Sequence, residues 1–468
     1  MSYLFMNSRG TRHSQSAFSV RLFRNAIAPI LCNFSRCDVR LVFFFSLFTF
    51  HLSLAQSPTL DYAHYIIDTL TSPYMDGRGY VDSGEFKAAT FIRNEFSKDS
   101  LLQFRNSYFQ PMFLDVNIFP GEMKLTIGNK ALTPGKDFLV NPSSQSVDGV
   151  FQLYKLEKNN DTSAASIEKL LEPLIERKHN KKWSQTFIAI QRDQFTKEQY
   201  NFFKQTVDVS ACFGSAGCIE FTNEKLTWDA STDTRSYCYL QVTGKLPKEK
   251  NSLVSIDIES EFKKNYSTQN VLGFYRGISV PDSFIVFTAH YDHLGQMGDG
   301  TYFPGANDNA SGTSMVLNLV KYFSQHPSKY SVAFICFTGE ELGLLGSTYF
   351  VQHPQFPIDK IKFLVNLDIV GTGDEGIKVV NATEFPKQFD QLVKLNDEHQ
   401  YLRTVSPRGK AANSDHYPFY VNGVPCFFIY TMGGIAAYHD VNDRSETLPL
   451  TDYEDLFKLL IDFEKSLE

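Results

Sequence analysis

The feature that most constrains the fold is a series of continuous apolar runs in the C-terminal half, each followed by acidic or histidine residues. Phe284–Ala289 leads to His290, and Val332–Phe337 leads to Glu340. Unbroken runs of this length are typical of strands buried on both faces of a parallel sheet. Between them, Ser311–Ser324 has apolar residues at helical spacing. We therefore expect an α/β domain with a mainly parallel, mixed sheet flanked by helices.

Changes in residue composition and in hydrophobic pattern divide the rest of the chain into segments. Residues 1–55 read as a targeting segment, and residues 56–122 as the N-terminal part of the α/β domain. Residues 123–250 combine short alternating runs with turn residues, which predicts a β-rich insert. The main domain is expected over residues 251–468.

The targeting segment has the order of a secretory signal. A basic stretch that includes Arg36 and Arg40 precedes the apolar run Leu41–Phe50, and small residues including Ala55 follow. The run is shorter than the roughly 20 residues that a spanning helix needs. We expect export to a periplasm or to the outside, with no stable membrane span after cleavage. Because the basic stretch is long for a signal, we also expect translation to start downstream of Met1.

Composition excludes some functions. The formal net charge of −7 and the absence of long basic runs argue against a nucleic-acid partner. No CxxC pair occurs, which argues against a thiolate zinc site. Cys212, Cys218 and Cys238 allow one disulfide in an exported protein, and its pairing stays open.

The first strand end offers a histidine and an aspartate at a meaningful spacing. On an extended chain, His290 and Asp292 point to the same side. This arrangement suits a metal-bound imidazole whose second nitrogen is held by a carboxylate. Asp308, at the start of the next helix, could either cap that helix or bind metal.

The remaining strand ends add acids and a second histidine. Adjacent glutamates usually form a solvated helix face, but Glu340 and Glu341 directly follow a buried strand. One could bind metal while the other serves as general base. Asp368 follows an apolar run, where an unpaired carboxylate is costly. His439 follows a glycine loop, and alone would more often be structural. Together these residues predict two cations bridged by a carboxylate, for which zinc is suited.

As a set, these motifs resemble those of the di-zinc aminopeptidases of metallopeptidase family twenty-eight, to which glutamate carboxypeptidases and glutaminyl cyclases are related. The resemblance spans roughly residues 270–468. It rests on His290-x-Asp292, Gly305–Gly312, Glu340–Ser347, Asn366–Asp368 and Tyr438-His439.

The resemblance implies a zinc-exopeptidase fold with two zinc ions per chain. It places His290, Asp308 and Asp368 on one ion. Asp308 also bridges to the second ion, which Glu341 and His439 complete.

The resemblance also assigns roles around the ions. Glu340 is implied to be the general acid and base, and Asp292 to orient His290. The segment Asn413–Phe419 resembles the family's Ser-Asp-His segment, which lines the site. The residue that stabilises the oxyanion stays open, because Arg408 and Lys410 stand where some relatives supply a tyrosine.

The implied activity is hydrolysis of peptide bonds, with aminopeptidase action the commonest in the family and carboxypeptidase action not excluded. The β-rich insert loosely resembles a protease-associated domain, and either handles substrate or is a neutral insertion. One rival is a single-zinc glutaminyl cyclase, against which His290 and Asp368 argue. The other is a non-catalytic binding protein with the same fold, against which the intact Glu340 argues.

Overall fold

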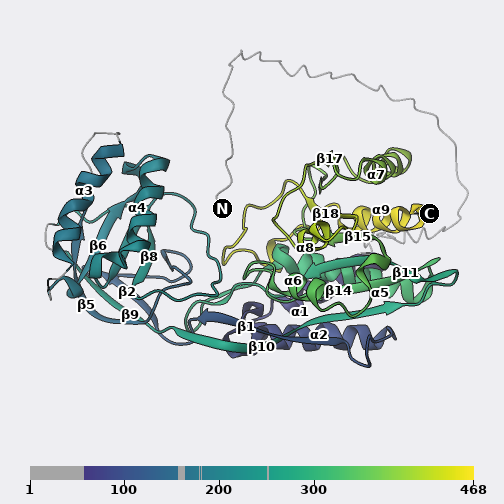
Figure 1. Ribbon diagram of the computed structural model, residues 1–468, viewed down its shortest axis with the longest axis horizontal. Coiled ribbons are helices and arrows are strands. Elements are labelled where there is room, and N and C mark those ends of the chain that lie inside the picture. Colours follow the sequence, from purple (N-terminus) through teal and green to yellow (C-terminus); the bar gives the residue numbers. More distant parts are fainter. Residues whose placement is uncertain (1–56, 157–163, 179, 181, 250–251, 468) are drawn as a thin grey trace, which may run out of the picture. The chain divides into compact units, whose positions relative to one another are not determined.

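The computed structural model describes residues 57–156, 164–178, 180, 182–249 and 252–467 (Figure 1). The expected signal, residues 1–55, lies outside the described residues. Within the described part, none of the helices combines the length and the apolar character that crossing a membrane requires.

The helices fall where apolar spacing and end signals direct them. Ser57, for example, caps the first helix by accepting a hydrogen bond from the Leu60 backbone N–H at 3.2 Å, and Pro58 opens the first turn. The α-helices are α1 (Pro58–Leu70), α2 (Gly84–Lys98), α3 (Ala164–Arg177), α4 (Lys197–Val209), α5 (Gly312–Gln325), α6 (Leu345–Gln352), α7 (Pro386–His399), α8 (His416–Val421) and α9 (Tyr453–Ser466).

The main sheet is mixed, with a parallel centre. Its order is β1 (Phe109–Ile118), β10 (Glu261–Tyr275), β14 (Tyr330–Phe337), β11 (Val280–His290), β15 (Ile361–Leu367), β18 (Cys426–Thr431), β16 (Ile377–Val380) and β17 (Val405–Pro407). The four central strands, β14, β11, β15 and β18, are parallel to one another. The expected fold class is confirmed, and the carboxyl ends of these four strands meet at one edge.

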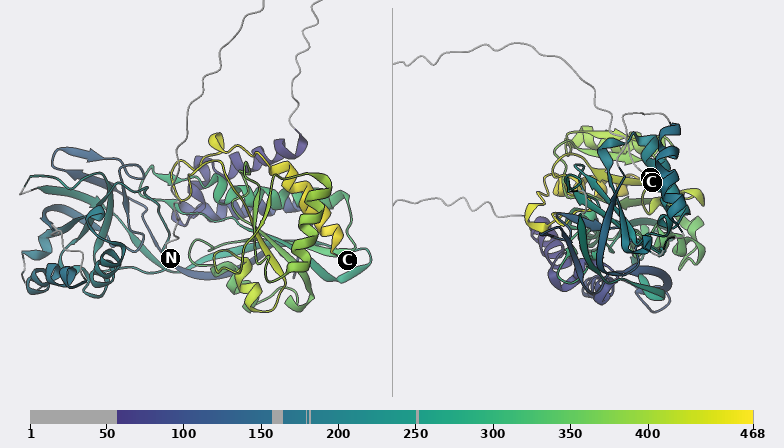
Figure 2. Two further views of the ribbon diagram at one scale, coloured as in Figure 1. Left: turned by 90° about the horizontal axis from the view of Figure 1, so that it is seen from above. Right: turned by 90° about the vertical axis from the view of Figure 1, so that its left-hand side faces the viewer.

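Helices cover both faces of this sheet (Figure 2). One face packs against α1, α2, α5 and α9 in a cluster that includes Phe287 and Phe363. The other face packs against α6 and α8 through residues such as Phe350 and Phe419. Burial on both faces explains why the central strands are apolar throughout.

A second sheet lies between β1 and β10 in the sequence. Its order is β3 (Lys130–Leu132), β2 (Met123–Ile127), β9 (Leu253–Ile258), β5 (Val147–Lys155), β6 (Thr186–Gln191), β7 (Gly217–Thr222), β8 (Cys238–Thr243) and β4 (Phe138–Val140). Strands β5 to β8 are parallel. Helices α3 and α4 lie on the same face of these strands (Figure 1). We call residues 123–258 the insert; a short hairpin of β12 (Gly295–Gln296) and β13 (Tyr302–Phe303) lies outside it.

The cysteines of the insert are not bonded to one another. Cys212, Cys218 and Cys238 are buried free thiols. Burial raises the pKa of Cys212 and Cys238 to about 12. The disulfide that an exported protein allows here is therefore absent among the described residues, and these cysteines act as small apolar side chains.

Candidate metal centre

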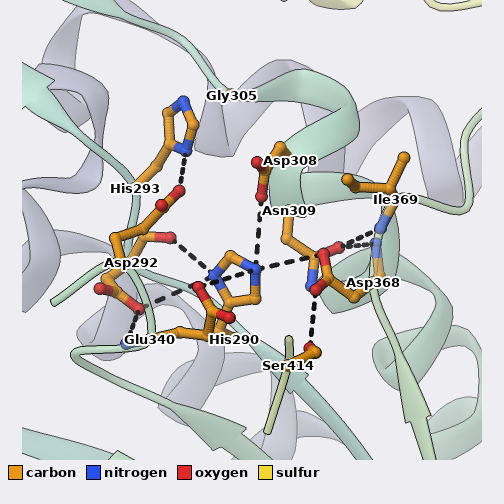
Figure 3. A network of polar contacts seen from close by, with 12 residues as sticks. His290, Asp292, His293, Gly305, Asp308, Asn309, Glu340, Asp368, Ile369 and Ser414 are labelled. Atoms are coloured by element: carbon orange, nitrogen blue, oxygen red, sulfur yellow. Dashed lines mark hydrogen bonds and ion pairs between the residues drawn. The ribbon is translucent and has the colours of Figure 1, made fainter. Parts of the chain in front are cut away.

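The predicted site residues gather at the carboxyl edge of the four central strands, and Figure 3 shows five of them, His290, Asp292, Asp308, Glu340 and Asp368. His290 ends β11, Glu340 follows β14 after two residues, and Asp368 directly follows β15. In a parallel sheet this edge is where side chains from different strands converge. The helix-start residue Asp308 joins them from the turn Ala306–Ser311.

His290 is the centre of the first group. Its Nε2 lies 3.2 Å from Asp368 Oδ1 and 3.3 Å from Asp308 Oδ1. On the other side of the ring, Nδ1 lies 3.1 Å from the Asp292 main-chain oxygen and 3.8 Å from the Asp292 carboxylate. Residue 292 therefore orients the ring chiefly through its carbonyl, and its carboxylate instead accepts a hydrogen bond from the Glu340 backbone N–H at 3.2 Å.

His439 is the centre of the second group. Its Nε2 lies 3.1 Å from Glu341 Oε2 and 3.3 Å from Asp308 Oδ2. Asp308 therefore presents one carboxylate oxygen to each histidine. This is the arrangement of a carboxylate that bridges two cations.

A third histidine, His293, belongs to the site and was given no role by the sequence. Its Nδ1 lies 2.6 Å from Glu341 Oε1, and its side chain is fully buried. Its backbone N–H donates to the Arg78 carbonyl oxygen at 3.2 Å. The only sequence signal for the place of His293 in the site is its position three residues after His290.

The chemistry of these donors fits metal binding. Three overlapping groups each bring ligand atoms within 4.8 Å of one another. They are His290 with Asp308 and Asp368, His290 with Glu340 and Glu341, and His293 with Asp308 and Glu341.

An orphaned nitrogen supports the same conclusion. His439 Nδ1 faces two oxygen acceptors, Trp228 O at 2.6 Å and Asp229 Oδ1 at 3.0 Å, so Nδ1 carries a proton. His439 Nε2 is buried and makes no aligned hydrogen bond, although two carboxylate oxygens lie within 3.3 Å. A cation between these three atoms would satisfy all of them at once.

The adjacent glutamates differ electrostatically. Burial, together with the charges of Asp368 and Glu341, raises the pKa of Glu340 well above its ordinary value, against the opposing effect of His290. Burial also acts to raise the pKa of Glu341, but His439 and His293 outweigh it and lower that pKa to about 2. Glu341 is thus held as an anion, as a ligand must be, whereas Glu340 readily accepts a proton.

Asp308 is likewise held as an anion. Burial alone would raise its pKa, but the imidazoles of His290 and His439, each 3.3 Å from one of its oxygens, hold the pKa well below its ordinary value. The carboxylate of Asp443 accepts the backbone N–H groups of Asn307 and Asp308 at 2.9 and 3.0 Å. This contact fixes the turn that carries Asp308.

A hydrogen-bonded series orients Asp368. Thr288 Oγ1 donates to Asn366 Oδ1 at 2.6 Å, and Asn366 Nδ2 donates to Ser414 Oγ at 2.8 Å. Ser414 Oγ in turn donates to Asp368 Oδ2 at 2.7 Å (Figure 3). The motif Asn366–Asp368 and the Ser-Asp-His segment are therefore two parts of one support. The next residue, Asp415, is buried, which raises its pKa to about 7.

The fold is that of zinc aminopeptidases. A zinc aminopeptidase from Bacillus subtilis superimposes with a TM-score of 0.62 at 19% identity, over 87% of this chain and 93% of that chain. An aminopeptidase from Aneurinibacillus sp. strain AM-1 superimposes with a TM-score of 0.57 at 20% identity, over 86% and 92%. Identities this low establish the architecture alone.

Sequence comparison finds a family model that matches part of the chain. Residues 270–463 match the family described as Peptidase family M28. The matched region contains every predicted ligand, and over this region the resemblance stated from the motifs is confirmed.

The curated relatives match over about a third of the chain. Aminopeptidase YwaD of Bacillus subtilis is 31% identical over 170 residues, 34% of this chain and 35% of its own length. A probable leucine aminopeptidase 2 of Aspergillus oryzae is 28% identical over 190 residues, 38% of this chain and 36% of its own length. The matched region thus spans about a third of the length of these relatives.

Proposed function

We propose that this protein is an exported zinc aminopeptidase that binds two zinc ions. The observation that carries the proposal is the position of Asp308, whose two carboxylate oxygens each face a different histidine. His290 and Asp368 would complete one site, and Glu341 and His439 the other. The basic and apolar segment over residues 1–55 supports export.

Bound zinc supplies positive charge that polarises a scissile carbonyl and acidifies water. The protein's own part in the reaction begins with Glu340, which takes a proton from the attacking water. Glu340 then delivers that proton to the leaving amine. Its place beside the first group, with a carboxylate oxygen 3.9 Å from His290 Nε2, supports this role.

Tyr438 is our candidate for the oxyanion donor. Its ring stacks on the His439 imidazole with 3.8 Å between centroids. Tyr438 is 53% exposed, and the partial burial of its phenol, followed by the charges of Asp308 and Glu341, raises the pKa of that phenol above its ordinary value. The phenol therefore stays protonated and can donate a hydrogen bond to an oxygen that becomes negative. Arg408, considered from the sequence, donates to Tyr430 OH at 3.0 Å.

The surroundings favour a substrate with a free amino group. Buried carboxyl groups lie beside the proposed ligands, and burial raises the pKa of Asp292 to about 6 and that of Asp415 to about 7. Each therefore keeps part of its negative charge at neutral pH and attracts an α-ammonium group. A cavity of about 150 Å³ adjoins Asp308. Its lining is mostly small or apolar and includes Ile435 and Ala437. We propose that this cavity receives the side chain of the N-terminal residue.

The test compares Glu340→Gln with the wild-type chain on aminoacyl chromogenic substrates, with zinc counted per chain. Glu340→Gln should keep both zinc ions and lose about 10²–10⁴-fold in kcat, because the ligands remain but the base is removed. Glu446→Gln, at an exposed position, is the control and should match wild type.

Substrate blocking completes the test. Acetylation of the substrate's amino group should abolish cleavage by the wild-type chain. Wild-type activity in Glu340→Gln would disprove the assigned base. Cleavage of the acetylated substrate would disprove aminopeptidase action.

A further inference from the structure

A short segment of the insert contacts the loop that carries His439. This segment, Lys225–Asp229, follows β7 and is here called the clamp. It contacts the loop Ala436–Asp440, here called the His439 loop. The Trp228 backbone N–H donates to the His439 carbonyl oxygen at 3.1 Å, and His439 Nδ1 donates to the Trp228 carbonyl oxygen at 2.6 Å.

Asp229 adds a charge to this contact. Its Oδ1 lies 3.0 Å from His439 Nδ1, so the imidazole N–H lies between a carbonyl and a carboxylate. Both acceptors hold the proton on Nδ1 and direct Nε2 toward Asp308 and Glu341. A carboxylate on the far nitrogen is what makes a histidine a better metal ligand.

Lys225 holds the same loop by its main chain. Its Nζ donates to the carbonyl oxygens of Ala436 at 2.7 Å and Tyr438 at 2.9 Å. Its charge also lies 3.7 Å from Asp440. The loop therefore has its backbone fixed at the residues on either side of Ala437. Ala437 and Tyr438 line the cavity beside Asp308.

The clamp is itself anchored. Trp228 is only 4% exposed, and its indole Nε1 donates to the Val140 carbonyl oxygen at 2.7 Å. Its ring stacks on Phe303 with 4.7 Å between centroids. In contrast, the Asp229 side chain is 71% exposed, so its contact with His439 can be removed without opening a core. This contrast separates the anchoring residue from the residue that acts on the imidazole.

We infer that the insert is a working part of the metal centre: the clamp positions the His439 loop, and Asp229 is the positioning residue for the His439 imidazole. This inference rests on the proposed function. The insert is then not a neutral insertion, because two of its residues, Trp228 and Asp229, bind the far nitrogen of the proposed ligand His439. These residues lie more than 200 positions before His439 in the sequence.

The experiment measures the affinity of each zinc ion by chelator competition in Asp229→Ala. Removal of the carboxylate should weaken one of the two zinc ions about tenfold and leave the other unchanged, since the Trp228 carbonyl still accepts from Nδ1. At saturating zinc, kcat should fall and KM should stay constant. Asp229→Glu should restore part of the affinity. Asp233→Ala, an exposed aspartate in the same connection, is the control and should match wild type.

A second variant tests whether Lys225 positions the His439 loop. Lys225→Met should raise KM for substrates with large N-terminal side chains more than it lowers kcat, because Ala437 and Tyr438 line the cavity. Lys245→Met, at an exposed position of the insert, is the matched control and should match wild type.

The outcomes distinguish a failure of this inference from a failure of the proposed function. If Asp229→Ala binds both zinc ions as tightly as wild type, or if Asp233→Ala loses as much affinity, the inference is overturned. If Lys225→Met and Lys245→Met have the same KM, Lys225 does not position the His439 loop. A wild-type chain that binds no zinc in the same titration overturns the proposed function, and the inference with it.

Discussion

At the scale of single residues, adjacent positions acquire different chemistry from their partners. Glu341 lies between His293 and His439, at 2.6 and 3.1 Å, and is held as an anion. Glu340 is 3.9 Å from its nearest histidine, His290, and burial raises its pKa. The proposed division into ligand and base rests on these distances. A chain that exchanged the two roles would need a different set of histidines around each carboxylate.

Substitutions at His439 and His293 distinguish a zinc ligand from a residue that only contacts a ligand. His439→Ala removes a proposed ligand and should leave one zinc ion per chain. His293→Asn removes only the contact to Glu341 Oε1 and should leave two zinc ions, one of them held about tenfold more weakly. Metal analysis with chelator competition measures both, and His399→Asn, at an exposed position, is the control. Loss of one zinc ion in His293→Asn, with both retained in His439→Ala, would reverse the assignment.

The residue types of the site could be read from the sequence, but some of their contacts could not. The spacing of His290 and Asp292 predicts a paired imidazole, whereas the structure shows the main-chain oxygen of Asp292 closer than its carboxylate. Strand β11 ends at His290, so the alternation of a strand does not determine the direction of the Asp292 side chain. Asp229 lies 210 positions from His439, and no local pattern connects them.

At the scale of elements, one buried arginine joins the N-terminal segment to the loops of the site. Arg78 is fully buried and ends the short helix η1 (Pro73–Arg78). Its guanidinium donates to five carbonyl oxygens, those of Leu70, Tyr291, Pro304, Gly305 and Asp308. Burial lowers its pKa to about 10, against the opposing effect of nearby carboxylates, so it is charged at neutral pH.

Arg78→Met should therefore destabilise the protein strongly. The substitution leaves several buried carbonyl oxygens without donors, which costs on the order of 3–5 kcal/mol in the free energy of unfolding. Denaturant unfolding measures this loss. Arg105→Met removes an exposed arginine whose contact to Pro354 O is 3.4 Å, and it should change stability by less than about 0.5 kcal/mol. Equal stability of the two variants would show that Arg78 is dispensable.

Gly305 shows why this loop has little freedom. Its φ is +63°, and a Cβ there would lie 2.3 Å from the Asp308 carbonyl oxygen and 2.6 Å from Arg78 Nη2. The motif Gly305–Gly312 thus reflects close approach of the arginine to the backbone, as well as the placement of Asp308.

The elements themselves were mostly predictable where burial is strongest. The apolar runs correspond to β11, β14, β15 and β18, since strands buried on both faces must be apolar. The antiparallel pairing of β1, β10 and β14 was not predictable, because it depends on contacts between residues that are far apart in the sequence. For the insert, the sequence predicted only β-rich structure, and it did not predict that β5 to β8 are parallel.

At the scale of the whole molecule, the insert packs against residues outside it. The cluster beneath the second sheet includes Leu294, Met297 and Phe303, which lie between β11 and Asp308 in the sequence. The insert boundary and its relation to protease-associated domains stay predictions. Because Leu294 directly follows His293, a change in the stability of the site also acts on the packing of the insert.

Zinc removal should therefore lower the stability of the folded chain as a whole. Without cations, the carboxylates of Asp308, Asp368 and Glu341 lie buried near one another, and only the histidines and the Arg78 guanidinium are described beside them as balancing charges. A ligand present at 1,000 times its Kd stabilises the state that binds it by about 4 kcal/mol, which corresponds to roughly 5 °C in Tm for a chain of this size. Scanning calorimetry with and without a chelator measures this shift. His439→Ala should show a smaller zinc-dependent shift, because one site is lost. An unchanged Tm after both zinc ions are removed would mean that the carboxylate cluster is balanced by protons alone.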